Sequence, residues 1–302
     1  MSNHHMAPGT LPGITPSARP EGMVVCTYGG GVNSVAVLVL LKRLGIRPHA
    51  IVMSDPGSEW PRTYEYRDTI MPPWLEANGF PPITVVKRSE MESVSVERRE
   101  SLREQCLRTS TLPSAAYGWK KCSQKFKATV VNAWFREQGW VKDEWKAKRR
   151  LVKAIGYDAG EDSRIRPEFN CPTERKRYVP WYPLYDRWYD RRGCKDLILS
   201  EGLPLPGKSA CTFCPHNKDE EWALLSIQEP REFEAALELE AKAMPSITEP
   251  GTVGLRRNGR HGDRVLGEWA KTEEFAAIRR RVEAGLDDDD DDESLLPCEC
   301  AL

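Results

Sequence analysis

Residues 23–34 read Met-Val-Val-Cys-Thr-Tyr-Gly-Gly-Gly-Val-Asn-Ser and determine how the rest of the chain is interpreted. Mostly apolar, β-favouring residues occupy 23–27, and Tyr28 then leads into three glycines. A second apolar run, 35–44, ends at Gly45. This order predicts a buried strand, a tight loop and a helix. Glycines let backbone N–H groups approach a ligand, and a helix N-terminus carries about half a positive charge, so the stretch predicts an anion site.

Further apolar runs alternate with helical segments along the chain. The runs at 49–53, 83–86 and 151–155 predict strands. A helix is expected over 63–78 with an interruption at its two prolines, and the charged stretch 89–104 is also expected to be helical. Strands that alternate with helices predict an α/β fold with a doubly wound parallel sheet.

Two of the predicted strands end in polar residues. Ser54 and Asp55 follow the second apolar run, at a carboxyl end where open α/β sheets bind ligands. Glu161 and Arg164 follow the fourth run. The alternatives are an ordinary Asp-Pro-Gly turn at the first position and a loop ion pair at the second.

The nine cysteines are the second signal, since metal or redox chemistry is the first expectation for such a count in an intracellular chain. Cys211 and Cys214 have the Cys-x-x-Cys spacing that lets two thiolates bind one metal. Cys194, on a helix leading into their loop, and Cys122, in a lysine-rich helix start, complete the expected set. An iron–sulfur cluster and Zn²⁺ are both compatible with four thiolates. Of the other cysteines, Cys26 is expected in the core, Cys106 and Cys171 in polar loops, and Cys298 and Cys300 on the acidic tail.

Composition sets the domain limits. With 302 residues the chain accommodates one large domain with an appendage, which gives a lead at 1–21, an α/β domain at 22–185, a cysteine and helical region at 186–286, and a tail at 287–302. Neither a signal peptide nor a transmembrane segment is expected, so the predicted location is the cytoplasm. The tail holds eight of the 45 acidic side chains and none of the 44 basic ones, which leaves a net charge of +7 on the rest. Such a mildly basic body suits phosphate-bearing ligands.

The glycine loop resembles the PP-loop, Ser-Gly-Gly-x-Asp-Ser, of ATP pyrophosphatases. Gly30, Gly31 and Ser34 match that pattern, whereas Gly29 replaces its first Ser and Asn33 replaces its Asp. Residues 54–64 resemble the Asp-Thr-Gly-x-x-x-Pro-Glu-Thr segment of phosphoadenosine phosphosulfate (PAPS) reductases, with Pro56 in place of the Thr. Residues 156–164 resemble the Gly-Ile-Arg-x-x-Glu-Ser-x-x-Arg stretch of the same family. The cysteine set is similar to that of the DndC-type sulfur-transfer proteins, although the adjacent cysteines of the assimilatory reductases are absent here.

The resemblance implies an adenine nucleotide α-hydrolase-like fold and an ATP-dependent sulfur transferase. Its cofactors would be ATP with Mg²⁺ and a [4Fe-4S] cluster, with Zn²⁺ as the alternative. Its partners would be ATP or a phosphoadenosine nucleotide, a nucleic-acid acceptor, and a cysteine desulfurase or another sulfur donor. Two other functions stay open, a PAPS or adenylyl-sulfate reductase and a non-catalytic nucleotide-sensing partner in a DNA modification or defence complex. The implied site residues are Asn33, Ser34, Glu161 and Arg164 for catalysis; Tyr28, Gly29, Gly30, Gly31, Val32, Ser34, Ser54 and Asp55 for the nucleotide; and Cys122, Cys194, Cys211 and Cys214 for the metal.

Overall fold

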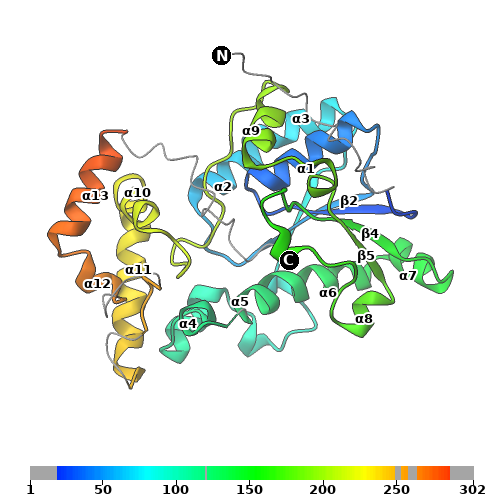
Figure 1. Ribbon diagram of the computed structural model, residues 1–302. Helices are drawn as coiled ribbons and strands as arrows, with labels where there is room; N and C mark the ends of the chain where they lie inside the picture. The colour runs from blue at the N-terminus through cyan, green and yellow to red at the C-terminus, as the bar shows by residue number, and fades with distance from the viewer. Residues whose placement is uncertain (1–18, 120, 249–252, 258–263, 286–302) are drawn as a thin grey trace, which may run out of the picture.

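A five-stranded parallel sheet with helices on both faces forms the body of the protein, as the computed structural model shows (Figure 1). The structure describes residues 19–119, 121–248, 253–257 and 264–285. The strands are β1 (Val24–Thr27), β2 (Ala50–Asp55), β3 (Ile83–Lys87), β4 (Leu151–Ala154) and β5 (Tyr178–Trp181). Their order is β3-β2-β1-β4-β5, and every neighbouring pair is parallel. The α/β doubly wound expectation is therefore confirmed at this level.

The sheet order reverses between β1 and β4. The chain moves outward from β1 through β2 to β3 and then returns to the other side of β1. In open α/β sheets, ligands bind outside the carboxyl ends of the strands at such a reversal. The glycine loop after β1 and the loop after β4 therefore meet at the position where this architecture places its sites.

Fifteen helical segments other than short 3₁₀ turns connect and extend the sheet in the described residues, and two of them are π-helical turns, η1 and η5. They are α1 (Val32–Arg43), α2 (Pro61–Glu65), η1 (Tyr66–Ile70), α3 (Met71–Ala77), α4 (Leu102–Thr109), α5 (Lys121–Ser123), η5 (Gln124–Ala128), α6 (Thr129–Glu137), α7 (Gly139–Lys146), α8 (Pro172–Arg175), α9 (Arg191–Leu199), α10 (Asp219–Gln228), α11 (Pro230–Ala243), α12 (Leu266–Trp269) and α13 (Glu273–Glu283).

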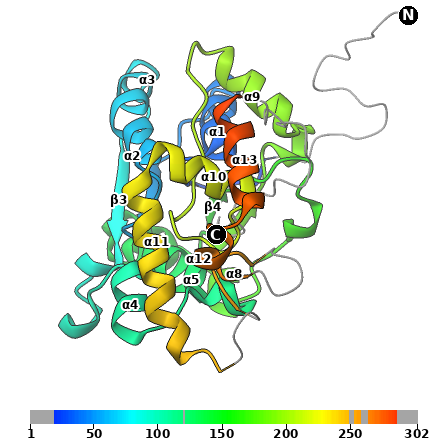
Figure 2. The ribbon, with the colours of Figure 1, turned by 90° about the vertical axis from the view of Figure 1, so that its left-hand side faces the viewer.

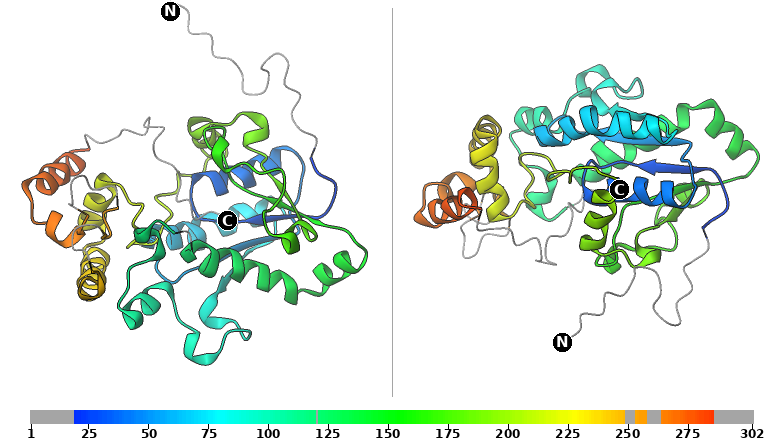
Figure 3. Two further views of the ribbon diagram at one scale, coloured as in Figure 1. Left: turned by 60° about the horizontal axis from the view of Figure 1, so that its bottom comes forward. Right: turned by 90° about the horizontal axis from the view of Figure 1, so that it is seen from above.

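Two apolar cores cover the two faces of the sheet. One packs α1, α3 and α9 against the strands, and the other packs α6 and α7 against the opposite face. Figure 3 shows these helices in layers on either side of the strands. Helix α9 belongs to the first core, so part of the region 186–286 is built into the sheet body.

A third core joins α4 to a group of helices beside the sheet. It contains buried residues of α4, α10, α11, α12 and α13 together with the Cys211–Cys214 segment. Figure 2 shows α10, α11 and α13 side by side at one flank of the molecule. Among the described residues no helix combines the length and the apolar character that a membrane span requires.

Several local expectations need correction. The stretch 89–104 is mostly irregular, with short 3₁₀ turns, and α4 begins only at Leu102 because Ser101 and Glu104 form a capping box there. The helical segment at 63–78 continues through its prolines, which occupy the first turn of α3, where proline is tolerated. Strand β5 was not predicted. The N-terminal lead up to residue 18, the tail with Cys298 and Cys300, and residues 251, 252 and 258–263 of the glycine- and arginine-rich stretch 251–267 lie outside the described residues.

Candidate functional site

The glycine loop leads directly into the N-terminus of α1. Gly31 is the residue before the helix, no side chain caps it, and the first turn has no acidic residue. The amides of the first turn and the helix dipole therefore favour an anion at this end. Ser34 donates its hydroxyl to the Gly31 carbonyl at 2.8 Å. The predicted phosphate site thus has the backbone that such a site requires.

Two other segments lie against this loop. Gly30 has a φ of +80°, and a Cβ there would come within 2.4 Å of the Thr63 Cγ2 atom. A Cβ on Gly31 would come within 3.2 Å of the Ser209 Cβ. The Ser209 hydroxyl donates to the Gly29 carbonyl, and Gly29 itself has open space where a Cβ would lie. Glycine is therefore required at 30 by its backbone conformation and packing, a Cβ at 31 would be tight against Ser209, and Gly29 is the position with room for a ligand.

Asn33 is the centre of a buried polar network. Its amide nitrogen donates to Asp158 Oδ2 at 2.9 Å and to Glu161 Oε2 at 3.0 Å. Its amide oxygen accepts from Arg191 at 3.1 Å. Asn33, Asp158 and Glu161 are each at most 5% exposed. The network joins the loops after β1 and β4, so the structure brings the predicted residues Asn33 and Glu161 together.

The charges of this network are nearly balanced. Arg164 forms an ion pair with Glu161. Burial raises the pKa of Glu161; Arg164 opposes this rise and Asp158 adds to it. Gly156 permits the close packing, because a Cβ there would lie 2.9 Å from the Asn33 carbonyl group. Asp158 and Arg191 were not singled out from the sequence, although Asp158 lies in the loop that was.

Asp55 and Ser54 occupy the carboxyl end of β2, as predicted, but their side chains bond within the protein. Asp55 Oδ1 accepts from the Gly57 amide at 2.7 Å and from the Tyr64 hydroxyl at 2.7 Å. Ser54 donates to the Phe126 carbonyl at 2.6 Å. Burial and the hydrogen bond to Asp55 raise the pKa of Tyr64. These contacts fix the loop between β2 and α2. Tyr28 and Val32 are buried at the two ends of the glycine loop.

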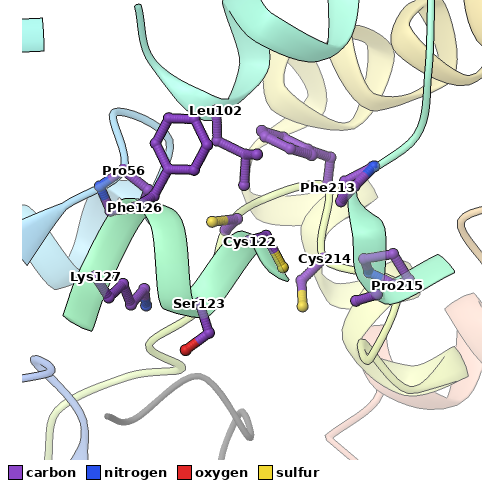
Figure 4. Close-up of a pocket in the computed structure, with 12 residues that line it drawn as sticks. Pro56, Leu102, Cys122, Ser123, Phe126, Lys127, Phe213, Cys214 and Pro215 are labelled. Carbon is purple, nitrogen blue, oxygen red and sulfur yellow. The ribbon is translucent and has the colours of Figure 1, made fainter. Parts of the chain in front are cut away.

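Three of the four predicted metal ligands border one pocket. Cys122, Cys211 and Cys214 line it together with apolar residues from several elements (Figure 4). Cys211 and Cys214 form a tight turn in which the Cys214 amide donates to the Cys211 carbonyl at 3.0 Å. The Cys122 amide donates to Ser114 Oγ at 2.8 Å. In the described residues no group of three His, Cys, Asp or Glu side chains is already arranged to hold a metal.

The structure does not bring Cys194 to this pocket. It lies on the apolar face of α9, fully buried in the core that α9 shares with α1, and burial raises the pKa of its thiol well above the usual value. Cys106 was expected in a polar loop, and this prediction is wrong. It lies on α4, is 2% exposed, and belongs to the same apolar core as the three pocket cysteines. Cys26 is in the core, as predicted, and Cys171 is exposed.

The glycine loop and the cysteine pocket are joined by one segment. The Lys208 carbonyl accepts from Thr63, and the Ala210 carbonyl accepts from the Trp60 amide at 3.1 Å. Two residues later the Thr212 amide donates to the Ser58 carbonyl at 2.8 Å. Pro56, which follows Asp55, lines the cysteine pocket. The two predicted sites are therefore connected through residues 208–212 and the β2–α2 loop.

A scan against protein-family models finds no match for this chain, and a search of the curated proteins finds no similar sequence.

Proposed function

We propose that the protein is an ATP-dependent sulfur transferase with a PP-loop nucleotide site of the adenine nucleotide α-hydrolase-like type. The observation that carries this proposal is the connection between two chemistries. A glycine loop at an uncapped helix N-terminus suits a pyrophosphate, and a pocket lined by three cysteines beside it suits sulfur. A nucleotide fold without the cysteines, or a cysteine pocket far from the loop, would not favour this function.

In the proposed reaction an oxygen of the acceptor attacks the α-phosphorus of ATP, and pyrophosphate leaves. A sulfur nucleophile then displaces AMP, so the acceptor exchanges oxygen for sulfur. The loop amides from Gly29 onward and the amide end of α1 would hold the phosphates, with the Ser34 hydroxyl turning from the Gly31 carbonyl toward them. Arg164 and Arg191 supply positive charge beside Asn33. Donors fixed in place before the reaction would supply most of the acceleration.

The cysteine pocket fits a metal group by the chemistry of its donors. Cys122, Cys211 and Cys214 would hold a [4Fe-4S] cluster, or Zn²⁺ as the alternative, because thiolates are the ligands that both prefer. A bound cluster would supply an iron site for sulfur. The protein itself provides an apolar enclosure from Leu102, Phe126 and Phe213, which limits water around that sulfur.

The first test combines ATP binding with ATP cleavage. Ser34→Ala should weaken ATP binding at least about tenfold, because a hydrogen bond to a charged group contributes roughly 1.5–3 kcal/mol. Ser226→Ala is the matched control, since Ser226 makes the same kind of bond, to the Ala223 carbonyl at 2.7 Å, but on helix α10 and outside the glycine loop. Calorimetric titration measures both variants. Equal ATP affinity in the two would remove the glycine loop from the nucleotide site.

A second candidate function is a non-catalytic nucleotide sensor. It is favoured by Asn33, an amide at the place where the PP-loop pattern has an acid, all of whose polar atoms are engaged within the protein. Release of AMP and pyrophosphate from ATP, measured with anaerobically prepared protein, sulfide and single-stranded DNA or RNA, separates the two functions. Cleavage supports the transferase, and tight ATP binding without cleavage supports the sensor.

A further inference from the structure

A short ordered loop exposes two aromatic side chains. Trp119 is 59% exposed and Tyr117 is 39% exposed, whereas Ala115 and Ala116 between α4 and α5 are buried. The Trp119 amide donates to the Ser114 carbonyl at 3.0 Å, and Ser114 Oγ donates to the Trp119 carbonyl at 3.3 Å. The two rings therefore stand on a fixed turn and not on a loose chain. Large aromatic surface held in water in this way indicates an interaction surface.

Basic side chains continue this surface along α5 and η5. The Lys121 ammonium lies 4.8 Å from the centroid of the Trp119 ring. Lys125 follows one turn later, and its ammonium lies 5.3 Å from the centroid of the Phe126 ring. Burial, together with the charges of Arg88, Arg98 and Arg108, lowers the pKa of Lys125, and Glu100 opposes this effect.

Part of this positive charge is not neutralised by the protein. Glu100 pairs with Arg108 through two hydrogen bonds of 2.8 and 2.7 Å. Within the part of the chain that the structure describes, Lys121 and Arg98 form no ion pair and no side-chain hydrogen bond, and both are exposed. An anion is therefore the complementary partner for this side of the surface.

The surface adjoins the cysteine pocket. Cys122 lies between Lys121 and Lys125 in the sequence, and its amide is bonded to Ser114 at the base of the aromatic turn. Phe126 lines the pocket (Figure 4). The Arg88 guanidinium lies 5.7 Å from the centroid of its ring. A molecule that lies on Trp119 and these cations would thus reach the mouth of the pocket.

We infer that Tyr117 and Trp119, with Lys121 and Lys125, bind single-stranded nucleic acid. Bases stack on exposed aromatic rings, and phosphates pair with neighbouring cations. A duplex keeps its base faces covered, so the rings select unstacked strands. An acidic protein surface would use the cations and leave the ring faces without a stacking partner. The inference deepens the proposed function, because it names the class of acceptor, but binding is measured without ATP and so fails or succeeds independently of sulfur transfer.

The test uses a fluorescein-labelled single strand of twelve nucleotides and fluorescence anisotropy with the full chain. Trp119→Ala should weaken binding about tenfold, since stacking on one aromatic ring contributes roughly 1–3 kcal/mol per base. Trp119→Phe should retain most of the affinity. Trp188→Ala is the matched control, because Trp188 is 48% exposed at a different place in the fold, after β5, and should leave binding unchanged.

Salt dependence tests the charged half of the surface. Lys121→Gln should reduce the slope of log K against log salt by about 0.7, the value for one phosphate contact on a single strand. Equal binding of Trp119→Ala and the parent chain, or equal affinity for a duplex of the same sequence, would overturn the inference. Displacement of the strand by polyglutamate with no effect of Trp119→Ala would assign the surface to an acidic protein partner instead.

Discussion

Asn33 bonds to two residues of the loop after β4 that lie 125 and 128 residues later in the sequence. It can do so because its side chain is an amide. Its two side-chain N–H groups donate to two carboxylates, and its side-chain oxygen accepts from a guanidinium. An aspartate at this position would have no N–H to donate and would add a third negative charge beside Asp158 and Glu161. The departure from the PP-loop pattern is therefore matched by the residues around it.

Asn33→Asp should destabilise the protein by about 3 kcal/mol at pH 8, the size expected when a buried polar network is left with unpaired charge. A third carboxyl in this buried group raises the pKa of the crowded carboxyls in the folded state, so above about pH 4 the folded state binds more protons than the unfolded state until they ionise. Stability then falls as the pH rises through that interval, and the loss should be smaller at pH 5.5. Urea unfolding at the two pH values measures both effects.

The exchange variant Asn33→Asp/Asp158→Asn is the control for this prediction. It keeps one amide and two carboxylates in the same space, so the amide can donate from the other side. It should recover at least half of the stability that Asn33→Asp loses. Equal stability of the single variant and the parent chain at both pH values would contradict the role assigned to Asn33.

At the scale of elements, strand β4 contains a buried lysine outside the proposed site. Lys153 is 3% exposed, and its ammonium donates to Asn132 Oδ1 at 2.6 Å. The ammonium also lies 3.8 Å from the centroid of the Tyr178 ring and 5.3 Å from that of Phe169. Burial lowers the pKa of Lys153 to about 8, because the neighbouring groups stabilise the charge less than water does.

This lysine should make stability depend on pH. Between about pH 8 and 10.5 the unfolded state holds the Lys153 proton and the folded state does not, so stability rises with pH through this window. Lys153→Met removes the titration and keeps the length of the side chain. The free energy of unfolding of the parent chain should therefore gain about 2 kcal/mol relative to that of Lys153→Met between pH 7.5 and 10. Parallel pH profiles for the two proteins would show that Lys153 titrates normally.

The elements with a local signal were the ones that the sequence predicted. The first four strands and α1 follow from apolar periodicity, because each pattern lies within one short window. Strand β5 was missed, since its Pro180 and aromatic residues resemble a turn. The 89–104 stretch was assigned to a helix by its charged composition, and tertiary contacts around Ser101 decide otherwise.

The candidate site was predicted where the signal was local and missed where it depends on distant contacts. Asn33, Glu161 and the Cys211–Cys214 pair were identified from their own motifs. Arg191 reaches Asn33 across 158 residues, and nothing in the chain near Arg191 indicates that contact. Ser209 and Thr63 were missed for the same reason, because their packing against Gly31 and Gly30 exists only in the folded chain.

At the scale of the whole molecule, the cysteines divide between two cores. Cys194 packs with α1 in the sheet body, whereas Cys106, Cys122, Cys211 and Cys214 belong to the core beside α10 and α11. Spacing alone could not separate them, because Cys194 lies only 17 residues before Cys211. The intervening chain leaves α9 and passes over the glycine loop before it reaches the pocket.

Metal content should depend on the pocket cysteines and not on Cys194. Cys122→Ser, Cys211→Ser and Cys214→Ser should each remove most of the iron, sulfide or zinc that anaerobically prepared protein retains, because each removes one thiolate from the same pocket. Cys194→Ala should keep the metal and lose about 1 kcal/mol of stability, since it only leaves a small cavity beneath α1. Elemental analysis and thermal unfolding of the same samples separate the two effects.

Cys106→Ala tests whether the buried thiol on α4 supplies a fourth ligand. If it does, the Cys106→Ala protein should lose metal as the pocket variants do. A folded Cys194→Ala protein without metal would return Cys194 to the ligand set and would require α9 to move away from α1.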